Sequence, residues 1–306
     1  MTRPPSPNVQ PRKRRSVLRL SGLAFVTLLA LAACKPIVAP PGPAPLRYRD
    51  EVFTSVDVTR DVQYATAVMR STGSPVSLLM DVYRPAGDTA TNRPVIIWVH
   101  GGSFRTGSKT SPDIVLLANA FARKGYVSIS INYRLSPQGC AAAAPTAECV
   151  LAIIDAKHDA QAAVRYVRAN ATSLGVDPNR IAIDGHSAGA ITALNVGFDA
   201  TETEPGGSNP GQSSAVAASV SLSGARLMGT SDPGDAPSLL FHGTADVLVP
   251  YAWAQATVND ARAAGLESYL TTWDGAGHVP LIEHLDEIVF QTTNFLYWTL
   301  QLDQLG

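Results

Sequence analysis

Cysteine is scarce in this chain of 306 residues, which contains three: Cys34, Cys140 and Cys149. Three cysteines are too few for a small disulfide-stapled domain, and no C-x-x-C pair suggests a zinc site. We therefore expect no metal and no organic cofactor. With 45% of residues hydrophobic and 16% charged, the chain is not of a disordered type and can bury a large core.

Positive charge is also scarce outside the N-terminus. Six of the 24 Lys and Arg residues lie in residues 1–33, which contain no acidic residue. The remaining chain holds 18 basic and 25 acidic residues, a net charge of −7. Nucleic-acid-binding domains carry basic surfaces, so this balance argues against a nucleic-acid partner.

The N-terminus has a basic stretch at 12–19 and an apolar run at 20–33. The run is shorter than the roughly 20 residues that span a bilayer, and the order of basic, apolar and small residues is typical of a secretory signal. Leu31-Ala32-Ala33-Cys34 resembles the lipobox of bacterial lipoproteins, which implies acylation of Cys34, although an ordinary signal peptide cut near Ala33 is an alternative. Arg14-Arg15-Ser16-Val17-Leu18 also resembles a twin-arginine export motif.

These features divide the chain into three parts. Residues 1–33 are predicted to be a lipoprotein signal peptide, and residues 34–45, which include five prolines, an extended tether that does not pack. Residues 46–306 are the expected folded domain. The predicted location is the bacterial cell envelope, where a lipid on Cys34 would anchor the protein to a membrane.

Strand-like and helix-like segments alternate along the domain. Apolar runs and alternating patterns predict strands, and three- and four-residue apolar spacing predicts helices. The expected strands are 76–83, 94–99, 126–131, 181–184, 217–222, 238–241 and 268–273, and the expected helices are 112–124, 150–167, 188–198, 251–264 and 283–300. This order predicts an α/β fold with a mostly parallel central sheet and helices on both faces. The polar stretch 202–214 is expected to be a flexible surface loop.

Gly185-His186-Ser187-Ala188-Gly189 matches G-x-S-x-G between a predicted strand and a predicted helix. A sharp strand-to-helix turn of this kind exposes the serine hydroxyl, and the glycines allow the close backbone approach that the turn needs. Ser187 is therefore the candidate nucleophile, with a tight turn carrying an incidental serine as the alternative.

A serine needs a base, and the chain has six histidines. Where a nucleophile sits on such a turn, the acid and then the histidine follow it along the chain. His278, in a loop after the last predicted strand, suits that order best, and His284 on the next helix is the second candidate.

The histidine in turn needs a carboxylate to orient it. Asp246 follows the predicted strand 238–241, at the edge of the sheet where active sites of open α/β sheets lie. The other aspartates between Ser187 and His278 are less tied to a strand end. They are Asp199, Asp232, Asp235, Asp260 and Asp274.

An oxyanion formed by serine attack requires backbone N–H donors. His100-Gly101-Gly102-Ser103 directly follows the predicted strand 94–99. An H-G-G-type loop in this position supplies one part of an oxyanion hole, and the residue after the nucleophile supplies another. The candidate donors are the amides of Gly102, Ser103 and Ala188. His100 is expected to brace the loop.

These motifs in this order (HGGSF, GHSAG, HGTAD and GAGH) resemble the α/β-hydrolase superfamily, and DVYRP and NYRLSP strengthen the likeness. The most similar branches are bacterial feruloyl and acetyl esterases and the carboxylesterases related to hormone-sensitive lipase. The resemblance covers about residues 60–300 and implies a serine carboxylesterase. HGGS in place of HGGG, GHSAG in place of GDSAG and the lack of a long N-terminal cap favour the feruloyl and acetyl branch.

The expected substrate is a small-molecule or polysaccharide-linked ester with a short acyl group or an aromatic acid, because no segment reads as a long apolar lid. Phe104, Tyr251 and Trp253 are the aromatic residues expected near the site. Two other functions stay open: a serine peptidase of the prolyl-oligopeptidase type, and a binding protein on a catalytically inactive scaffold.

Cys140 and Cys149 bracket an alanine-rich stretch and, in an exported protein, could form a disulfide. Two buried free thiols are the alternative.

Overall fold

The structure is a computed structural model, and it describes residues 1–2, 37–140 and 146–305. Cys34 and almost all of the predicted signal peptide lie outside the described residues. Within the described part, no helix is both long and apolar enough to cross a membrane.

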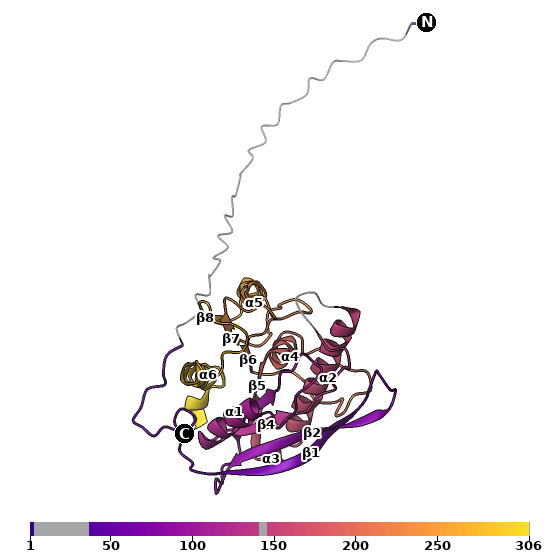
Figure 1. The fold of residues 1–306 in the computed structure, drawn as a ribbon. Coiled ribbons are helices and arrows are strands. Elements are labelled where there is room, and N and C mark those ends of the chain that lie inside the picture. The colour runs from indigo at the N-terminus through magenta and orange to yellow at the C-terminus, as the bar shows by residue number, and fades with distance from the viewer. Residues whose placement is uncertain (3–36, 141–145, 306) are drawn as a thin grey trace. The chain divides into compact units, whose positions relative to one another are not determined.

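A central sheet of eight strands organises the domain (Figure 1). Its spatial order is β1-β2-β4-β3-β5-β6-β7-β8. β1 pairs with β2 and β2 with β4 in antiparallel fashion, and all further pairs are parallel. The strands are β1 (Val56–Val68), β2 (Pro75–Pro85), β3 (Arg93–Val99), β4 (Val127–Ile131), β5 (Val176–His186), β6 (Ala218–Leu222), β7 (Ser238–Gly243) and β8 (Ser268–Trp273).

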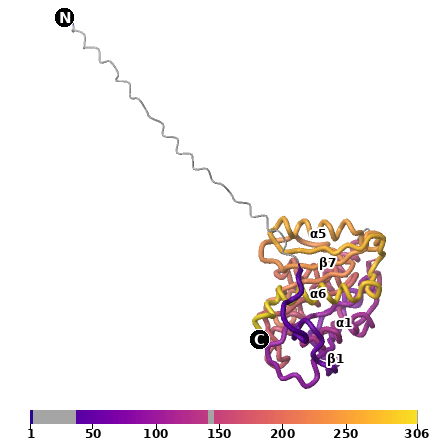
Figure 2. Tube along the Cα trace, turned by 90° about the vertical axis from the view of Figure 1, so that its left-hand side faces the viewer, coloured from indigo at the N-terminus to yellow at the C-terminus, as the bar shows by residue number. Residues whose placement is uncertain are grey.

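Helices cover both faces of this sheet. They are α1 (Pro112–Arg123), α2 (Ala147–Ala169), α3 (Ala171–Leu174), α4 (Ala188–Gly197), α5 (Tyr251–Ala263) and α6 (Leu285–Thr299), with a 3₁₀ turn η1 (Leu302–Leu305). Figure 2 looks onto the side covered by α1 and α6. The fully buried strand β3 shows why two layers are needed: Ile97 packs in the same cluster as residues of α2 and α4, while its neighbour Trp98 packs with α1 and α6. The predicted mostly parallel sheet with helices on both faces is thus confirmed.

The sequence patterns missed β1 and shortened β5. β1 is irregular, because its register with β2 shifts between Thr59 and Val62 and again between Gln63 and Ala65. These shifts break the period-two alternation that identifies a strand. Most of the first half of β1 is also exposed or half-buried, so it lacks the apolar run of an inner strand.

The proline-rich segment packs more than predicted. Residues 37–45 form no helix or strand, but Ile37 packs against the cluster of α6 and Pro40 is buried. The indole Nε1 of Trp298 donates to the Val38 carbonyl at 2.8 Å, and Arg49 donates to the Pro40 carbonyl at 2.9 Å. Proline has no backbone N–H donor but keeps its carbonyl acceptor. Side-chain donors elsewhere in the domain can therefore still hold a proline-rich segment in place.

The 202–214 loop has no helix or strand, but ion pairs fix its first part. The Lys157 ammonium, which is 1% exposed, lies 2.7 Å from a Glu202 carboxylate oxygen, and Arg134 lies 3.0 Å from Glu204. A buried lysine or arginine needs a counter-ion, so α2 and the loop after β4 hold these glutamates in place. The predicted loop is therefore present, and its first residues are tied to the domain by these ion pairs.

Candidate active site

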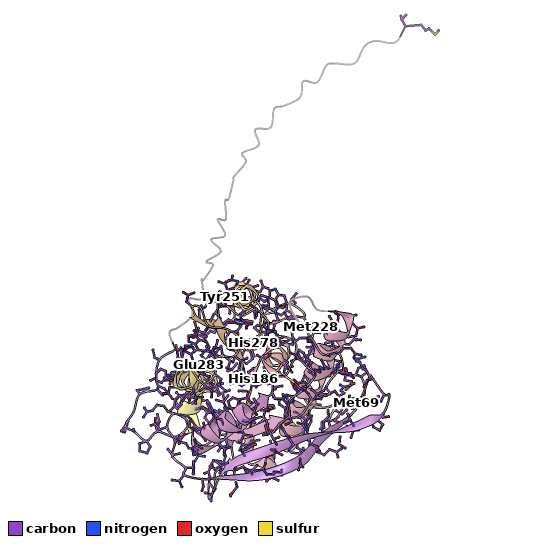
Figure 3. All side chains as sticks on the ribbon, viewed as in Figure 1. Met69, His186, Met228, Tyr251, His278 and Glu283 are labelled. Atoms are coloured by element: carbon purple, nitrogen blue, oxygen red, sulfur yellow. A yellow bond between two sulfur atoms is a disulfide. The ribbon has the colours of Figure 1, made fainter. Side chains whose placement is uncertain are left out.

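Five loops that follow parallel strands meet at one edge of the sheet. They follow β3, β5, β6, β7 and β8, and each begins at the carboxyl end of its strand. Figure 3 labels two residues of this region, His186 at the end of β5 and His278 in the loop after β8. Parallel strands bring their carboxyl ends to the same edge, so residues far apart in sequence become neighbours here.

Ser187 occupies a strained turn between β5 and α4. Its φ is 54° and its ψ is −120°, a conformation that non-glycine residues rarely adopt. The Ser187 N–H donates to the Leu222 carbonyl of β6 at 2.9 Å. A Cβ on Gly189 would lie 2.0 Å from the Val99 carbonyl oxygen, so only glycine lets α4 approach β3 this closely. The turn therefore presents the Ser187 hydroxyl at the sheet edge.

A chain of hydrogen bonds joins the three residues of the predicted triad. His278 Nε2 lies 2.8 Å from Ser187 Oγ, and His278 Nδ1 lies 2.7 Å from Asp246 Oδ2. The other candidate base, His284, stacks on Trp273 with ring centroids 4.0 Å apart and has its Nδ1 3.7 Å from Glu287. The structure therefore brings His278, and not His284, to the serine.

The Asp246 carboxylate is fully buried and surrounded by donors. Its Oδ1 accepts from the N–H groups of Leu248 and Val249 at 2.9 and 3.0 Å. Its Oδ2 also lies 3.1 Å from His242 Nε2, in addition to His278. Burial alone would raise the pKa of Asp246, but hydrogen bonds from the two histidines and from Val249 outweigh burial and hold this pKa well below its usual range.

Sequence reasoning missed His242. It is the second-last residue of β7, four residues before Asp246, and its Nε2 also faces the Val249 carbonyl at 2.8 Å. The position of a histidine at the carboxyl end of a strand was the available signal. His242 and the Val249 backbone together fix the turn that carries the acid.

The backbone that carries His278 is held by its neighbours. Val279 has φ 52°, an unusual value for a β-branched residue, and its N–H donates to Ser223 Oγ at 3.0 Å. Ser223 follows β6 and is fully buried. A Cβ on Gly243 would lie 2.3 Å from the Ala276 carbonyl oxygen, so glycine is needed where the acid loop passes the histidine loop. Ser223, like His242, was not predicted.

The three predicted oxyanion donors lie around Ser187. Gly102, Ser103 and Ala188 all line the same cavity as Ser187. Among the described residues, none accepts a hydrogen bond from the N–H group of any of the three. Gly102 has φ 111° and a Cβ there would lie 2.2 Å from the Thr106 carbonyl oxygen, so this tight loop requires glycine. The amides are thus free to bind an oxygen atom.

His100 braces the loop that carries two of these amides. Its Nδ1–H donates to the Gly101 carbonyl at 2.7 Å, and its ring stacks on Tyr133 at 4.3 Å. The Tyr133 hydroxyl donates to the His100 carbonyl at 3.0 Å. Burial lowers the pKa of His100 to about 4, so the ring is neutral near pH 7.

A second contact to the oxyanion loop comes from the residue before the nucleophile. His186 Nε2 lies 3.0 Å from the Gly101 amide nitrogen and 2.9 Å from Asp113 Oδ2. Nε2 of His186 accepts from the Gly101 N–H when it carries no proton and donates to Asp113 when it carries one, so the tautomer decides which bond forms. Burial would raise the pKa of Asp113, but the contact with His186 and the local amides lowers it. This cluster was not predicted.

A cavity of about 530 Å³, here called the Trp253 pocket, opens at Ser187. Most of its wall is apolar and includes Phe104, Ile153, Ile191, Leu227, Val249 and Trp253. The predicted disulfide between Cys140 and Cys149 is present, with Cα atoms 4.6 Å apart, and both cysteines line this pocket. Phe104 and Trp253 are placed as expected. Tyr251 does not line this pocket, but it lies near the acid, since its ring packs edge-on against His242 at 5.9 Å between centroids and its hydroxyl bonds to Thr272 Oγ1 at 2.8 Å.

A second cavity of about 670 Å³, here called the His186 pocket, lies beyond the oxyanion loop and shares Gly102 with the first. Asp113, His186 and Glu283 line it, together with Val279 and Ile282 from the segment after His278. The two pockets give room for two parts of a substrate. Within the described part of the chain, no group of histidine, cysteine, aspartate and glutamate side chains could hold a metal ion.

Comparison with solved structures identifies the architecture. Esterase 2 of Thermogutta terrifontis phosphorylated by paraoxon superposes with a TM-score of 0.61 at 24% identity, covering 80% of this chain and 92% of that one. The same esterase with propionate bound gives a TM-score of 0.59, also at 24% identity, over 78% and 93% of the two chains. The chain has the α/β-hydrolase fold. The loops described above are the loops in which this fold carries a nucleophile, an acid and a base.

Sequence comparisons match parts of the α/β-hydrolase domain. The BD-FAE family profile matches residues 80–226. Phenmedipham hydrolase of Pseudarthrobacter oxydans is 39% identical over 116 residues, which is 38% of this chain and 22% of that protein. Carboxylesterase NlhH of Mycobacterium tuberculosis is 39% identical over 98 residues, 32% and 27% of the two chains. The matches thus span about a fifth to a quarter of these relatives.

Proposed function

We propose that this α/β-hydrolase domain is a serine carboxylesterase that works through an acyl-enzyme. The observation that carries the proposal is the hydrogen-bonded chain from Ser187 through His278 to the buried Asp246. The matches to proteins named carboxylesterase, esterase and phenmedipham hydrolase support the same activity.

In the first half of the proposed reaction, Ser187 Oγ attacks the ester carbonyl while His278 Nε2 takes the hydroxyl proton. Asp246 stays ionised, since its pKa is lowered, and stabilises the imidazolium through Nδ1–H. The amides of Gly102, Ser103 and Ala188 bind the negative oxygen of the tetrahedral intermediate. His278 then returns the proton to the leaving alcohol, and the C–O bond to the alcohol breaks.

In the second half, water replaces the alcohol. His278 takes a proton from the water as its oxygen attacks the acyl-enzyme carbonyl, and it gives that proton to Ser187 Oγ when the acid leaves. No step of this cycle requires a redox partner.

The two pockets suit the two halves of an ester. The leaving oxygen must face His278 Nε2, so the alcohol half points toward the His186 pocket, whose wall includes Val279 directly after the histidine. The acyl half then points into the Trp253 pocket, which is lined by Ser187 and by the oxyanion-loop residues Gly102 and Ser103. We propose short acyl or aromatic acids as its occupants.

The proposal is tested by Ser187→Ala. Turnover of p-nitrophenyl acetate should fall on the order of 10⁶-fold, because nucleophile and base act as a unit. Ser173→Ala is the matched control: it removes another serine hydroxyl, bonded to the Asn170 carbonyl on α3, and should leave turnover intact. A fluorophosphonate probe should label the native protein and the control but not Ser187→Ala. Near-normal turnover by Ser187→Ala, or faster cleavage of peptides than of esters, would refute the carboxylesterase assignment.

We also propose that the enzyme is an exported lipoprotein anchored through Cys34. The basic and apolar N-terminal stretches support export, and so does the Cys140–Cys149 disulfide, since such bonds persist in oxidising compartments. Cys34→Ser should move the protein from the membrane fraction to the soluble fraction. Membrane retention of this variant would contradict the anchor.

A further inference from the structure

Arg105 is an exposed cation in the wall of the Trp253 pocket. Among the described residues, every other lysine or arginine has an ion pair or a hydrogen bond, but the Arg105 guanidinium has neither. In a domain with an excess of acidic residues, an arginine without a partner is unusual. Its position beside Ser187 gives it a potential role in the site.

The charge distribution around Ser187 is asymmetric. Among the described residues that line the Trp253 pocket, Arg105 is the only charged one, and none is aspartate or glutamate. The His186 pocket has the opposite character, since Asp113 and Glu283 line it and no lysine or arginine of the described chain does. An anionic group is therefore attracted on the acyl side of Ser187 and repelled on the alcohol side.

The backbone around Arg105 is fixed. The Arg105 N–H donates to the Gly102 carbonyl at 2.9 Å, within the same tight loop that carries the oxyanion amides. The segment after β4 bonds to the two residues before Arg105, with Cys140 N–H donating to the Ser103 carbonyl and Ser136 N–H to the Phe104 carbonyl, each at 2.8 Å. The backbone therefore needs no further ordering when the guanidinium binds a planar carboxylate with two N–H donors.

We propose that the preferred acyl half carries a carboxylate, so that the natural substrates are monoesters of dicarboxylic acids, and that Arg105 binds the free carboxylate. This inference rests on the proposed esterase activity. The apolar wall of the pocket then packs the hydrocarbon part of the acid, while Arg105 pairs with its far end. Hydrolysis releases the alcohol and the dicarboxylate, and it needs no further reactant.

The test compares two esters of equal size. Monoethyl glutarate has a terminal carboxylate, and ethyl glutaramate has an uncharged amide in its place, with hydrolysis followed at constant pH. We expect kcat/KM to favour the glutarate about threefold to fivefold, the size of one solvent-exposed ion pair, mainly through KM. About 0.5 M NaCl should reduce the preference, because salt screens exposed charges.

Variants distinguish an effect of Arg105 on the substrate preference from an effect of the protein's net charge. Arg105→Gln should bring the ratio of the two kcat/KM values close to one, and Arg105→Glu should reverse it in favour of ethyl 5-aminopentanoate, which carries an ammonium group. The matched control is Arg60→Gln, which removes one positive charge from β1, where the side chain is 62% exposed and 3.6 Å from Asp81. The control should keep the wild-type ratio.

Each outcome bears on one proposal. Equal hydrolysis of both esters by the wild type, or a preference that survives Arg105→Gln, would overturn the role of Arg105 and leave the esterase proposal standing. A preference for a carboxylate in the alcohol half, as in 3-butyryloxypropanoate, would overturn the assignment of the charge to the acyl side. No hydrolysis of any of these esters or of p-nitrophenyl acetate would overturn the esterase itself, and this inference with it.

Discussion

Two aspartates near the nucleophile, Asp184 and Asp246, are equally hidden from solvent but differ in their surroundings. Asp184 is 6% exposed and Asp246 is 7% exposed. Asp184 lies on β5 beside apolar side chains such as Trp98 and Phe241. Burial raises its pKa to about 8, opposed only in part by the Gly185 N–H. Asp246 is instead surrounded by two histidines and two backbone N–H groups, which lower its pKa.

The difference shows that burial alone does not set the charge of a carboxyl group in this fold. Burial acts in the same direction on both residues, and the number of donors decides the result. Asp184 is therefore mostly neutral near pH 7, whereas Asp246 is ionised. The proposed role of orienting a protonated histidine requires the second environment and would fail in the first.

The largest expected effect concerns the base that Asp246 orients. His278→Ala should reduce ester turnover on the order of 10⁶-fold, as for the nucleophile, because the two residues act together. His284→Ala is the matched control, since His284 stacks on Trp273 away from Ser187. It should change turnover less than tenfold in the same p-nitrophenyl acetate assay. A larger loss in His284→Ala than in His278→Ala would show that the base is wrongly assigned.

The next effect separates the two aspartates directly. Asp246→Asn should lower kcat by about 10⁴-fold, because an amide neither carries the charge nor favours the correct histidine tautomer. Asp184→Asn removes a buried carboxyl group of the same size, but one that is already neutral, so kcat should stay within about tenfold. Steady-state kinetics on both variants, with circular dichroism to check folding, provides the measurement. Similar losses in the two would mean that Asp246 acts only through the fold.

The smallest effect is on stability and its dependence on pH. The folded-state pKa of Asp184 is about 8, above the value near 4 in an unfolded chain, so between these values the folded state holds the extra proton. Stability contributed by this proton is present below pH 4 and is lost as pH rises toward 8. As pH rises from 5 to 8, Asp184→Asn should therefore lose less stability than the wild type, with a difference of about 1.4 kcal/mol per pH unit at most. Urea unfolding at several pH values measures this, and parallel stability curves would contradict it.

Sequence could predict the residues that carry the proposed chemistry because local backbone geometry ties them to short motifs. Ser187 needs glycine at position 189 to let α4 pass Val99, and Gly102 is needed for the oxyanion turn. Such constraints can be recognised as short sequence motifs. The positions of Asp246 and His278 after predicted strands can be recognised in the same way. The disulfide was predictable for a similar reason, because both cysteines lie close together in the chain.

The rest of the site depends on contacts that no local pattern encodes. Ser223 bonds to Val279, which lies 56 residues further along the chain, and His186 meets Asp113 at the start of α1. A serine or aspartate in such a place looks like any polar loop residue until the sheet brings the strand ends together. The sequence patterns did not single out Arg105, because its distinguishing feature is a guanidinium without an ion pair or hydrogen bond. That feature can be seen only when the structure gives the positions of the other charged residues.

The contact between Trp298 and Val38 bears on how far the folded domain can lie from a membrane if Cys34 carries the proposed lipid. Only three peptide steps separate Cys34 from Ile37, which already packs on the domain, and a fully extended chain covers at most about 10 Å over that length. A twelve-residue linker would let the domain move over a wide range around its anchor. With a linker of three peptide steps, the domain would stay close to the bilayer, with its α6 side near the headgroups. In that position the proposed esterase would act on esters at the membrane surface and would not reach esters farther away.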